Sequence, residues 1–174
     1  MSTEAMIDIE TFDTADTAVV FQIGLVLFGD KPTRHSIWNL DVQSQIDAGR
    51  TISADTLKFW LDPDISSVAQ TSLRSPEPYR SALASLDEML TGHVDEVGSI
   101  WAKGSFDFNV LESLYKQCGR LVPWEFYQCR DLRTLMKECD VPKHGNISHN
   151  ALDDCQHQVL QLLECRRVIG GQEA

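Results

Sequence analysis

The stretch AMIDIET, residues 5–11, sets the pattern from which the fold of this chain can be predicted. Apolar and acidic residues alternate in it, and successive side chains of a strand point to opposite faces. We therefore expect a strand whose Ile7 and Ile9 enter the core while Asp8 and Glu10 project together from the other face. Two neighbouring carboxylates on a hydrophobic strand are costly unless a cation offsets their charge. Taken alone, the pair is equally compatible with ordinary acids on a solvent-facing strand edge.

The residues that follow predict two more strands joined by short turns. Residues 17–28 (TAVVFQIGLVLF) form an almost continuous apolar run, which is typical of a buried strand, and residues 29–32 (GDKP) form a turn. Residues 34–42 (RHSIWNLDV) are predicted to form a third strand. Three consecutive strands with such short connections favour an antiparallel meander.

From residue 53 onward the pattern changes to alternating helices and strands. Ser53 is predicted to cap a short helix that runs to Leu61, and residues 61–77 are expected to be loop with at most one helical turn. The later elements are predicted as helices at residues 78–91, 107–118, 132–139 and 150–169, and as strands at residues 97–102 and 124–129. We expect an α/β fold in a single domain of residues 1–174, with a mixed five-stranded sheet flanked by helices.

The composition is that of an ordinary globular protein. Of the 174 residues, 43% are hydrophobic and 24% are charged. No stretch approaches the ~20 apolar residues that a membrane helix needs. The N-terminus has no basic region followed by an apolar one, so no secretory signal is expected. The five cysteines are odd in number and form no CxxC pair, which favours free thiols and a cytoplasmic location.

The formal net charge of −11 limits the ways in which this chain could bind nucleic acid. It argues against a high-affinity, sequence-reading DNA-binding protein, because affinity for phosphates comes mainly from Lys and Arg. It does not exclude an enzyme that grips only a few nucleotides. Acids that bind metal ions would also have their local field reversed by those ions.

A third acid, Asp107, falls at the junction between a strand and a helix. It follows the apolar stretch 97–102 and a Gly-Ser pair, and the helix predicted at residues 107–118 begins with it. Strand ends in such sheets are where ligands gather. Taken alone, Asp107 fits a helix N-cap at least as well.

The segment 149–154, His-Asn-Ala-Leu-Asp-Asp, combines an imidazole with acids at the start of the last predicted helix. Asn150 can cap that helix, which leaves His149 on the approach loop and Asp154 about one turn inside. A histidine is a natural general base near neutral pH. The alternative interpretation takes Asp153 and Asp154 as first-turn acids that complement the helix dipole, but it does not explain the histidine.

These three motifs together resemble those of the DEDDh, or DnaQ-like, 3′–5′ exonucleases of the ribonuclease H-like fold. That family has a DxE on its first strand, an Asp at a later strand-to-helix junction, and an H-x4-D at the start of its last helix. All three match in order, and they span residues 8–154. Residues 101–107 also resemble the compact prokaryotic and phage branch, which includes the mycobacterial-type exoribonuclease-like proteins and the T-even phage exodeoxyribonuclease.

The resemblance implies a role for each of eight residues. Asp8, Glu10, Asp107 and Asp154 would bind two divalent metal ions, Mg²⁺ or Mn²⁺, and His149 would deprotonate the attacking water. Thr11, Phe12 and Asn109 would contact the substrate, with Phe12 as an apolar wedge that stacks on a base. Core packing is an equal alternative for Phe12. Asp153 falls one residue short of the family spacing and is left out.

The expected function is therefore a metal-dependent 3′–5′ exonuclease that releases nucleoside 5′-monophosphates. Single-stranded DNA ends or 3′ overhangs are preferred as substrates because of the phage-like cast of the sequence, and trimming of RNA 3′ ends is the alternative. A nuclease fold retained only for binding nucleic acid is an alternative of another class, although such a protein has no need of four mutually repelling carboxylates. The resemblance also leaves a homodimer open, because several compact relatives dimerise.

Overall fold

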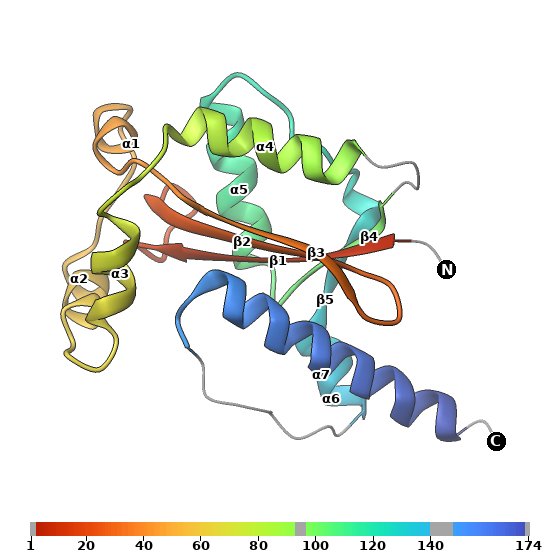
Figure 1. The fold of residues 1–174 in the computed structure, drawn as a ribbon. Coiled ribbons are helices and arrows are strands. Elements are labelled where there is room, and N and C mark those ends of the chain that lie inside the picture. Colours follow the sequence, from red (N-terminus) through yellow and green to blue (C-terminus); the bar gives the residue numbers. More distant parts are fainter. Residues whose placement is uncertain (1–2, 93–96, 140–147, 173–174) are drawn as a thin grey trace.

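The computed structural model describes residues 3–92, 97–139 and 148–172, and it contains the mixed five-stranded sheet predicted from the sequence. The strand order is β3-β2-β1-β4-β5 (Figure 1). The first three strands form an antiparallel meander, whereas β4 runs parallel to β1 and β5 runs parallel to β4. The strands are β1 (Thr3–Thr11), β2 (Val20–Phe28), β3 (Pro32–Asn39), β4 (Val97–Ala102) and β5 (Cys129–Asp131).

Alternation along β1 separates two hydrophobic layers. Ala5, Ile7 and Ile9 face the larger cluster, which contains residues of α4 (Tyr79–Thr91) and α5 (Phe106–Gln117). Met6 belongs to the cluster on the opposite face, which contains residues of α6 (Leu132–Cys139) and α7 (Ala151–Gln172). Figure 1 shows these two helix pairs on opposite sides of the sheet. Because Asp8 and Glu10 share the parity of Met6, both acids lie on the α7 face.

A close approach between α7 and β2 fixes where this helix begins. A Cβ added at Gly24 would lie 2.3 Å from the backbone carbon and oxygen of Ala151. Gly24 is also the cross-strand partner of Asp8. The absence of a side chain at Gly24 therefore lets the first turn of α7 rest on the sheet beside Asp8.

Three short helices lie between β3 and α4, and two of them differ from the prediction. In α2 (Ala54–Trp60) the Ser53 side chain accepts a hydrogen bond from Thr56 N, so the predicted cap is confirmed. The helices α1 (Gln43–Asp47) and α3 (Ser66–Ser72) were not predicted as such. Helices of five and seven residues are too short to be stable alone, so they form only because they pack against the rest of the protein.

Two predicted strands are shifted. The third strand is Pro32–Asn39 and not residues 34–42, because α1 begins at Gln43. The strand predicted at residues 124–129 is wrong over most of its length. Its middle is the 3₁₀ turn η1 (Phe126–Gln128), and pairing with β4 starts only at Cys129. The Trp124 ring is buried between the rings of Phe108 and Tyr115, so packing on α5 replaces strand pairing there.

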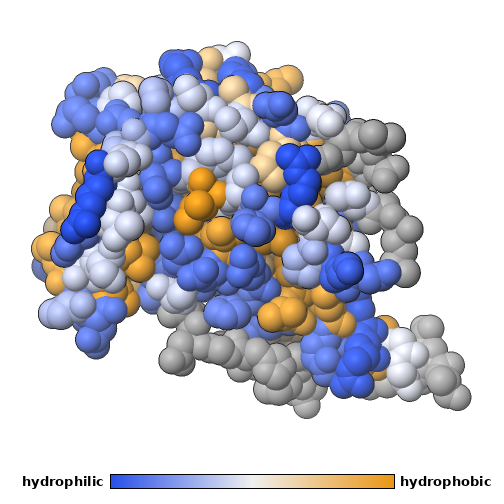
Figure 2. Space-filling model, viewed as in Figure 1, coloured by the Kyte–Doolittle hydropathy of each residue, from blue (hydrophilic) through white to orange (hydrophobic). Residues whose placement is uncertain are grey.

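The surface drawn in Figure 2 mixes residues of both kinds, with apolar residues in separate patches between hydrophilic ones. Among the described helices, none has the length and apolar character that crossing a bilayer requires.

Candidate active site

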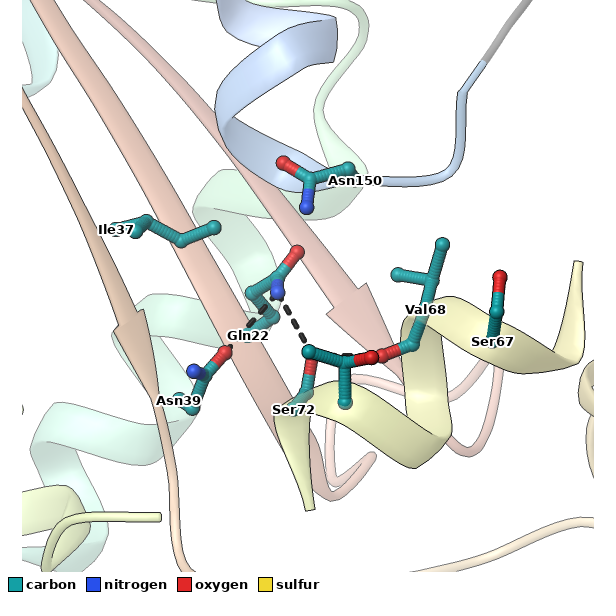
Figure 3. Close-up of a pocket in the computed structure, with 8 residues that line it drawn as sticks. Gln22, Ile37, Asn39, Ser67, Val68, Ser72 and Asn150 are labelled. Atoms are coloured by element: carbon teal, nitrogen blue, oxygen red, sulfur yellow. Dashed lines mark hydrogen bonds between the residues drawn. The ribbon is translucent and has the colours of Figure 1, made fainter. Parts of the chain in front are cut away.

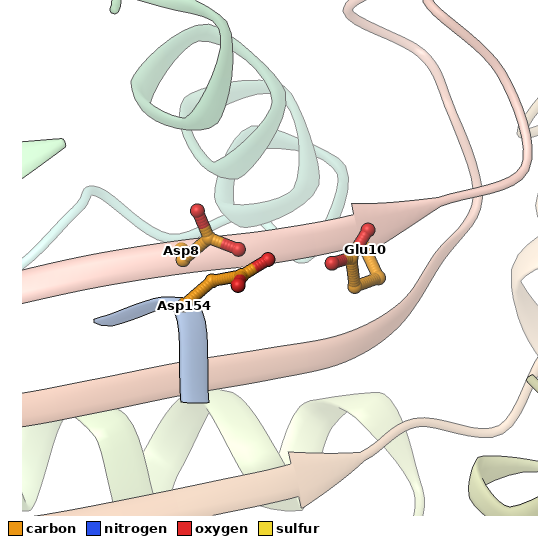
Figure 4. Close-up of side chains that lie close together, drawn as sticks. All are labelled: Asp8, Glu10 and Asp154. Carbon is orange, nitrogen blue, oxygen red and sulfur yellow. The ribbon is translucent and has the colours of Figure 1, made fainter. Parts of the chain in front are cut away.

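Three of the predicted carboxylates meet beside the first turn of α7 (Figure 4). Asp8, Glu10 and Asp154 each offer an oxygen atom, and these oxygens lie within 4.8 Å of one another. The two strand acids come from β1, and Figure 4 shows Asp154 entering from α7 toward both of them. Asp153 is exposed instead. The structure therefore places Asp154, and not its neighbour, in the position that the sequence motif predicts.

Asp107 joins this group from α5, the helix that packs on the opposite face of the sheet. It lies in the first turn of α5, its side chain is only 7% exposed, and its Oδ1 accepts a 3.1 Å hydrogen bond from the backbone N–H of Ile9. Ile9 stands between Asp8 and Glu10 in β1, so the bond fixes Asp107 beside both. We call Asp8, Glu10, Asp107 and Asp154 the carboxylate cluster.

The carboxylate cluster is electrostatically costly. Burial, and then the charges of Asp107 and Glu10, raise the pKa of Asp8 well above its ordinary value. Burial, followed by the charges of Asp154 and Asp107, raises the pKa of Glu10 to about 8. Burial also raises the pKa of Asp107 to about 6. The ionised cluster therefore needs a counter-charge near neutral pH.

The donor set fits a divalent cation. Carboxylate oxygens are the ligands that Mg²⁺ and Mn²⁺ prefer, and three of the four groups already lie close enough to share one ion. A bound cation would also offset the repulsion that raises the pKa values in the cluster.

Two polar residues that the sequence analysis did not select hold the ligand groups in place. Gln158 Nε2 donates a 2.7 Å hydrogen bond to Asp8 Oδ1. The backbone N and the Oγ of Ser148 both donate to Asp154 Oδ1, over 3.0 Å and 3.1 Å. Their positions in the sequence could have pointed to both residues, because Gln158 follows Asp154 by one helical turn and Ser148 directly precedes His149.

His149 lies at the rim of the site, packed against aromatic rings. Its ring meets Phe59 edge-on at a centroid distance of 4.9 Å and Trp60 at 6.0 Å. Trp60 Nε1 in turn donates a 2.8 Å hydrogen bond to the carbonyl of Thr11, which anchors α2 to the end of β1. The backbone of His149 is left-handed, with φ of 55°, a conformation that is uncommon outside glycine.

The three predicted substrate contacts differ in their exposure. Asn109 is exposed in the first turns of α5. Thr11 is buried, and its Oγ1 donates a 2.7 Å hydrogen bond to the Asp13 carbonyl. Phe12 is 5% exposed and stacks on Phe21 at a centroid distance of 4.6 Å. That placement matches the core-packing alternative for Phe12, and its role as a wedge stays a prediction.

A separate hollow of about 270 Å³ lies between β2, β3, α3 and Asn150, which caps α7 (Figure 3). Gln22 forms part of its wall and donates hydrogen bonds to Asn39 Oδ1 and Ser72 Oγ, over 3.0 Å and 2.7 Å. The Oε1 of Gln22 accepts from Ala151 N over 2.8 Å. The side chains that line this hollow are uncharged, so it is not a metal site. The hydrogen bond between Gln22 and Ala151 attaches the start of α7 to the sheet.

Solved structures of E. coli exonuclease I share this fold. The zinc-bound form of its complex with single-stranded DNA aligns with a TM-score of 0.68 at 13% identity, covering 99% of this chain and 41% of that one. A product-bound structure of an exonuclease I aligns with a TM-score of 0.67 at 14% identity, covering 97% of this chain and 43% of that one. The present chain thus spans about two-fifths of the length of those proteins. At this identity the likeness establishes the fold.

The family follows from the sequence as a whole. A comparison with curated proteins finds no match. The model of the 3′–5′ exoribonuclease Rv2179c-like domain, however, matches residues 3–165, nearly the whole chain. The chain therefore belongs to the Rv2179c-like family of 3′–5′ exoribonuclease domains.

Proposed function

We propose that this chain removes nucleotides one at a time from the 3′ end of single-stranded nucleic acid, with two divalent ions, Mg²⁺ or Mn²⁺, held by the carboxylate cluster. The observation that carries the proposal is the meeting of Asp8, Glu10 and Asp154 within 4.8 Å in a chain of an exonuclease family. Asp107, tied to the backbone of Ile9, completes the ligand set.

The protein would hold the ligand oxygens in place before the metal ions bind. When bound, the ions supply an acidified water and neutralise charge on the leaving 3′ oxygen. Gln158 orients Asp8, and Ser148 orients Asp154. Such outer contacts usually determine both metal affinity and activity.

His149 is the proposed general base. It would take a proton from the attacking water while the new bond from oxygen to phosphorus forms and the bond from phosphorus to the 3′ oxygen breaks. Its support is position, because the loop that carries it leads directly into the helix of Asp154. Phe59 and Trp60 restrict the ring from one side. The products are a nucleoside 5′-monophosphate and a strand shortened by one nucleotide.

Thr11, Phe12 and Asn109 remain the proposed contacts to the terminal nucleotide. Asn109 is supported by its exposure on the helix that carries Asp107. Thr11 and Phe12 are supported by their position directly after the DxE motif at the end of β1.

Two candidate substrates, DNA and RNA, differ in their sugar. The resemblance of the sequence to phage exonucleases favours DNA, and the E. coli exonuclease I structures include complexes with single-stranded DNA and with a dA16 oligonucleotide. RNA is the second candidate because the matched family is described as an exoribonuclease. Recognition of the 2′-hydroxyl needs only one or two contacts, so both candidates are compatible with the same metal site.

A single digestion experiment tests these statements. The protein is incubated with Mn²⁺ and 5′-labelled DNA and RNA of the same sequence, as single strands, blunt duplexes and 3′ overhangs. A ladder of products shortened from the 3′ end, abolished by a chelator, is the expected result. A strand blocked at its 3′ end is the control and should persist. Failure to shorten any substrate by a folded protein, or cleavage of a circular single strand, would contradict the proposal.

A further inference from the structure

The pairing of β1, β4 and β5 brings the start of α6 close to the carboxylate cluster. Met6 lies beside Trp101 in the pairing of β1 with β4, so the end of β4 is level with the part of β1 that leads into Asp8. Ala102 lies beside Asp131 in the pairing of β4 with β5. Arg133 follows Asp131 by two residues and belongs to α6, a helix that lies on the same side of the sheet as α7 (Figure 1).

Contacts with the loop before α5 hold the Arg133 side chain there. Its Nη2 donates a 3.1 Å hydrogen bond to the Lys103 carbonyl. Its guanidinium carbon would lie 3.8 Å from a Cβ at Gly104, a glycine with φ of 117°. The planar group therefore lies over the loop at Gly104, three residues before Asp107.

The charge of Arg133 acts on the carboxylate cluster. Burial raises the pKa of Asp107, and the positive charge of Arg133 partly opposes this effect. Arg133 is thus a basic side chain whose charge reaches the carboxylate cluster at Asp107. Arg120, Arg166 and Arg167 are instead paired with carboxylates elsewhere in the fold.

We propose that Arg133 binds a phosphate of the substrate strand at the edge of the carboxylate cluster, an inference that rests on the proposed exonuclease function. A guanidinium carries five N–H donors in a planar fork that matches phosphate oxygens, and the Lys103 carbonyl takes one of them. In a chain of net charge −11, the acids of the site repel a phosphate unless a cation lies beside them. Arg133 adds a positive charge of the protein itself to that of the proposed metal ions, at the ends of β4 and β5, while His149 lies by α2 at the end of β1.

The test is equilibrium binding of a single-stranded oligonucleotide in Ca²⁺, to prevent turnover, at several salt concentrations. Arg133→Gln removes the charge but keeps a side-chain donor for the Lys103 carbonyl, and Arg133→Lys keeps the charge without the fork. Arg167→Ala is the matched control, because it removes an exposed arginine from the far end of α7. Loss of one phosphate contact should weaken binding roughly tenfold or more and reduce the slope of log affinity against log salt by about 0.7.

A substrate with one phosphate identifies which phosphate is bound. If Arg133→Gln slows cleavage of the p-nitrophenyl ester of thymidine 5′-monophosphate as well as of an oligonucleotide, Arg133 contacts the scissile phosphate. If only the oligonucleotide is affected, it contacts a neighbouring one.

An unchanged salt slope in a normally folded Arg133→Gln protein, or an equal change in Arg167→Ala, would overturn the proposal. Wild-type protein that cleaves neither substrate in Mn²⁺ would refute the exonuclease function itself, so the two failures are distinguishable.

Discussion

The side-chain amide of Gln158 donates a 2.7 Å hydrogen bond to Asp8 Oδ1, across 150 positions of sequence. Gln158 is 4% exposed, and its Oε1 has no hydrogen-bond partner among the described residues. It lies one turn after Asp154 in α7. The same helical face therefore contributes one carboxylate of the cluster and orients another.

Replacing Gln158 by Leu should weaken metal binding while the fold is retained. Without the amide donor, Asp8 loses the contact that orients it, and loss of such an outer contact typically lowers metal affinity about 10–100-fold. Titration calorimetry with Mn²⁺ measures the effect directly. Gln156→Leu is the control, because a helical residue two positions away faces nearly the opposite side. Equal Mn²⁺ affinity in wild type and Gln158→Leu would show that Gln158 only fills space.

Replacing His149 by Ala should leave Mn²⁺ and oligonucleotide affinity intact and reduce turnover about 10²–10⁴-fold, as expected for a general base. Single-turnover cleavage separates this loss from product release. The exposed His157 of α7 offers a control, since His157→Ala removes an imidazole outside the site. Full activity of His149→Ala would refute the proposed role.

Replacing Asp8 by Asn should abolish metal-dependent cleavage and stabilise the metal-free protein. One of the repelling charges is removed, so the free energy of unfolding should rise by about 0.5–2 kcal/mol, the usual size of a single stabilising substitution. Urea unfolding at pH 8 with and without Mn²⁺ measures both effects, because only wild type should gain stability from the metal. Cleavage at the wild-type rate would exclude Asp8 from the site.

Stability of the metal-free protein should depend on the protonation of Glu10 and Asp107. Their folded pKa values, about 8 for Glu10 and about 6 for Asp107, lie above the ordinary values for Glu and Asp. Between its ordinary pKa and its raised pKa, each group binds more protons in the folded state than in the unfolded state. This contribution is complete below about pH 4, the unfolded range of these groups, and is lost as pH rises through 6 and then 8.

Unfolding curves from pH 5 to 9 should therefore show stability falling with pH in the presence of a chelator. Saturating Mg²⁺ should reverse the fall, because the ion binds the ionised form. Glu10→Gln should flatten the dependence between pH 7 and 9. A flat wild-type profile would contradict the raised pKa values.

Replacing Gly24 by Ala should displace α7 and damage the site from the opposite strand. The new methyl group would lie 2.3 Å from the Ala151 backbone, and overpacking of this kind costs about 1–3 kcal/mol. Metal affinity should fall as well, because Asp154 and Gln158 move with the helix. Gly29→Ala is the matched control, since nothing lies within 4 Å of the corresponding position. Thermal unfolding and Mn²⁺ titration of both variants provide the measurement.

Local sequence patterns were enough to predict much of the fold and of the candidate site. Alternation in residues 5–11 predicted which side chains of β1 enter the core and which pair of acids projects together. The resemblance to the H-x4-D motif of the DEDDh exonucleases favoured Asp154 over Asp153, and Asn150 Oδ1 does accept the N–H groups of Leu152 and Asp153 as a helix cap. Periodicity and capping are properties of neighbouring residues, so the sequence alone determined them.

Tertiary structure decided the contacts that complete the site. The bonds from Gln158 to Asp8 and from Ile9 to Asp107 join residues 150 and 98 positions apart. The position of Arg133 beside the carboxylate cluster depends on the pairing of β5 with β4. The position of α7 on the sheet depends on Gly24 in β2. Local propensity carries no information about register between distant segments. Burial of both sheet faces fixes that register, and with it the arrangement of the four carboxylates.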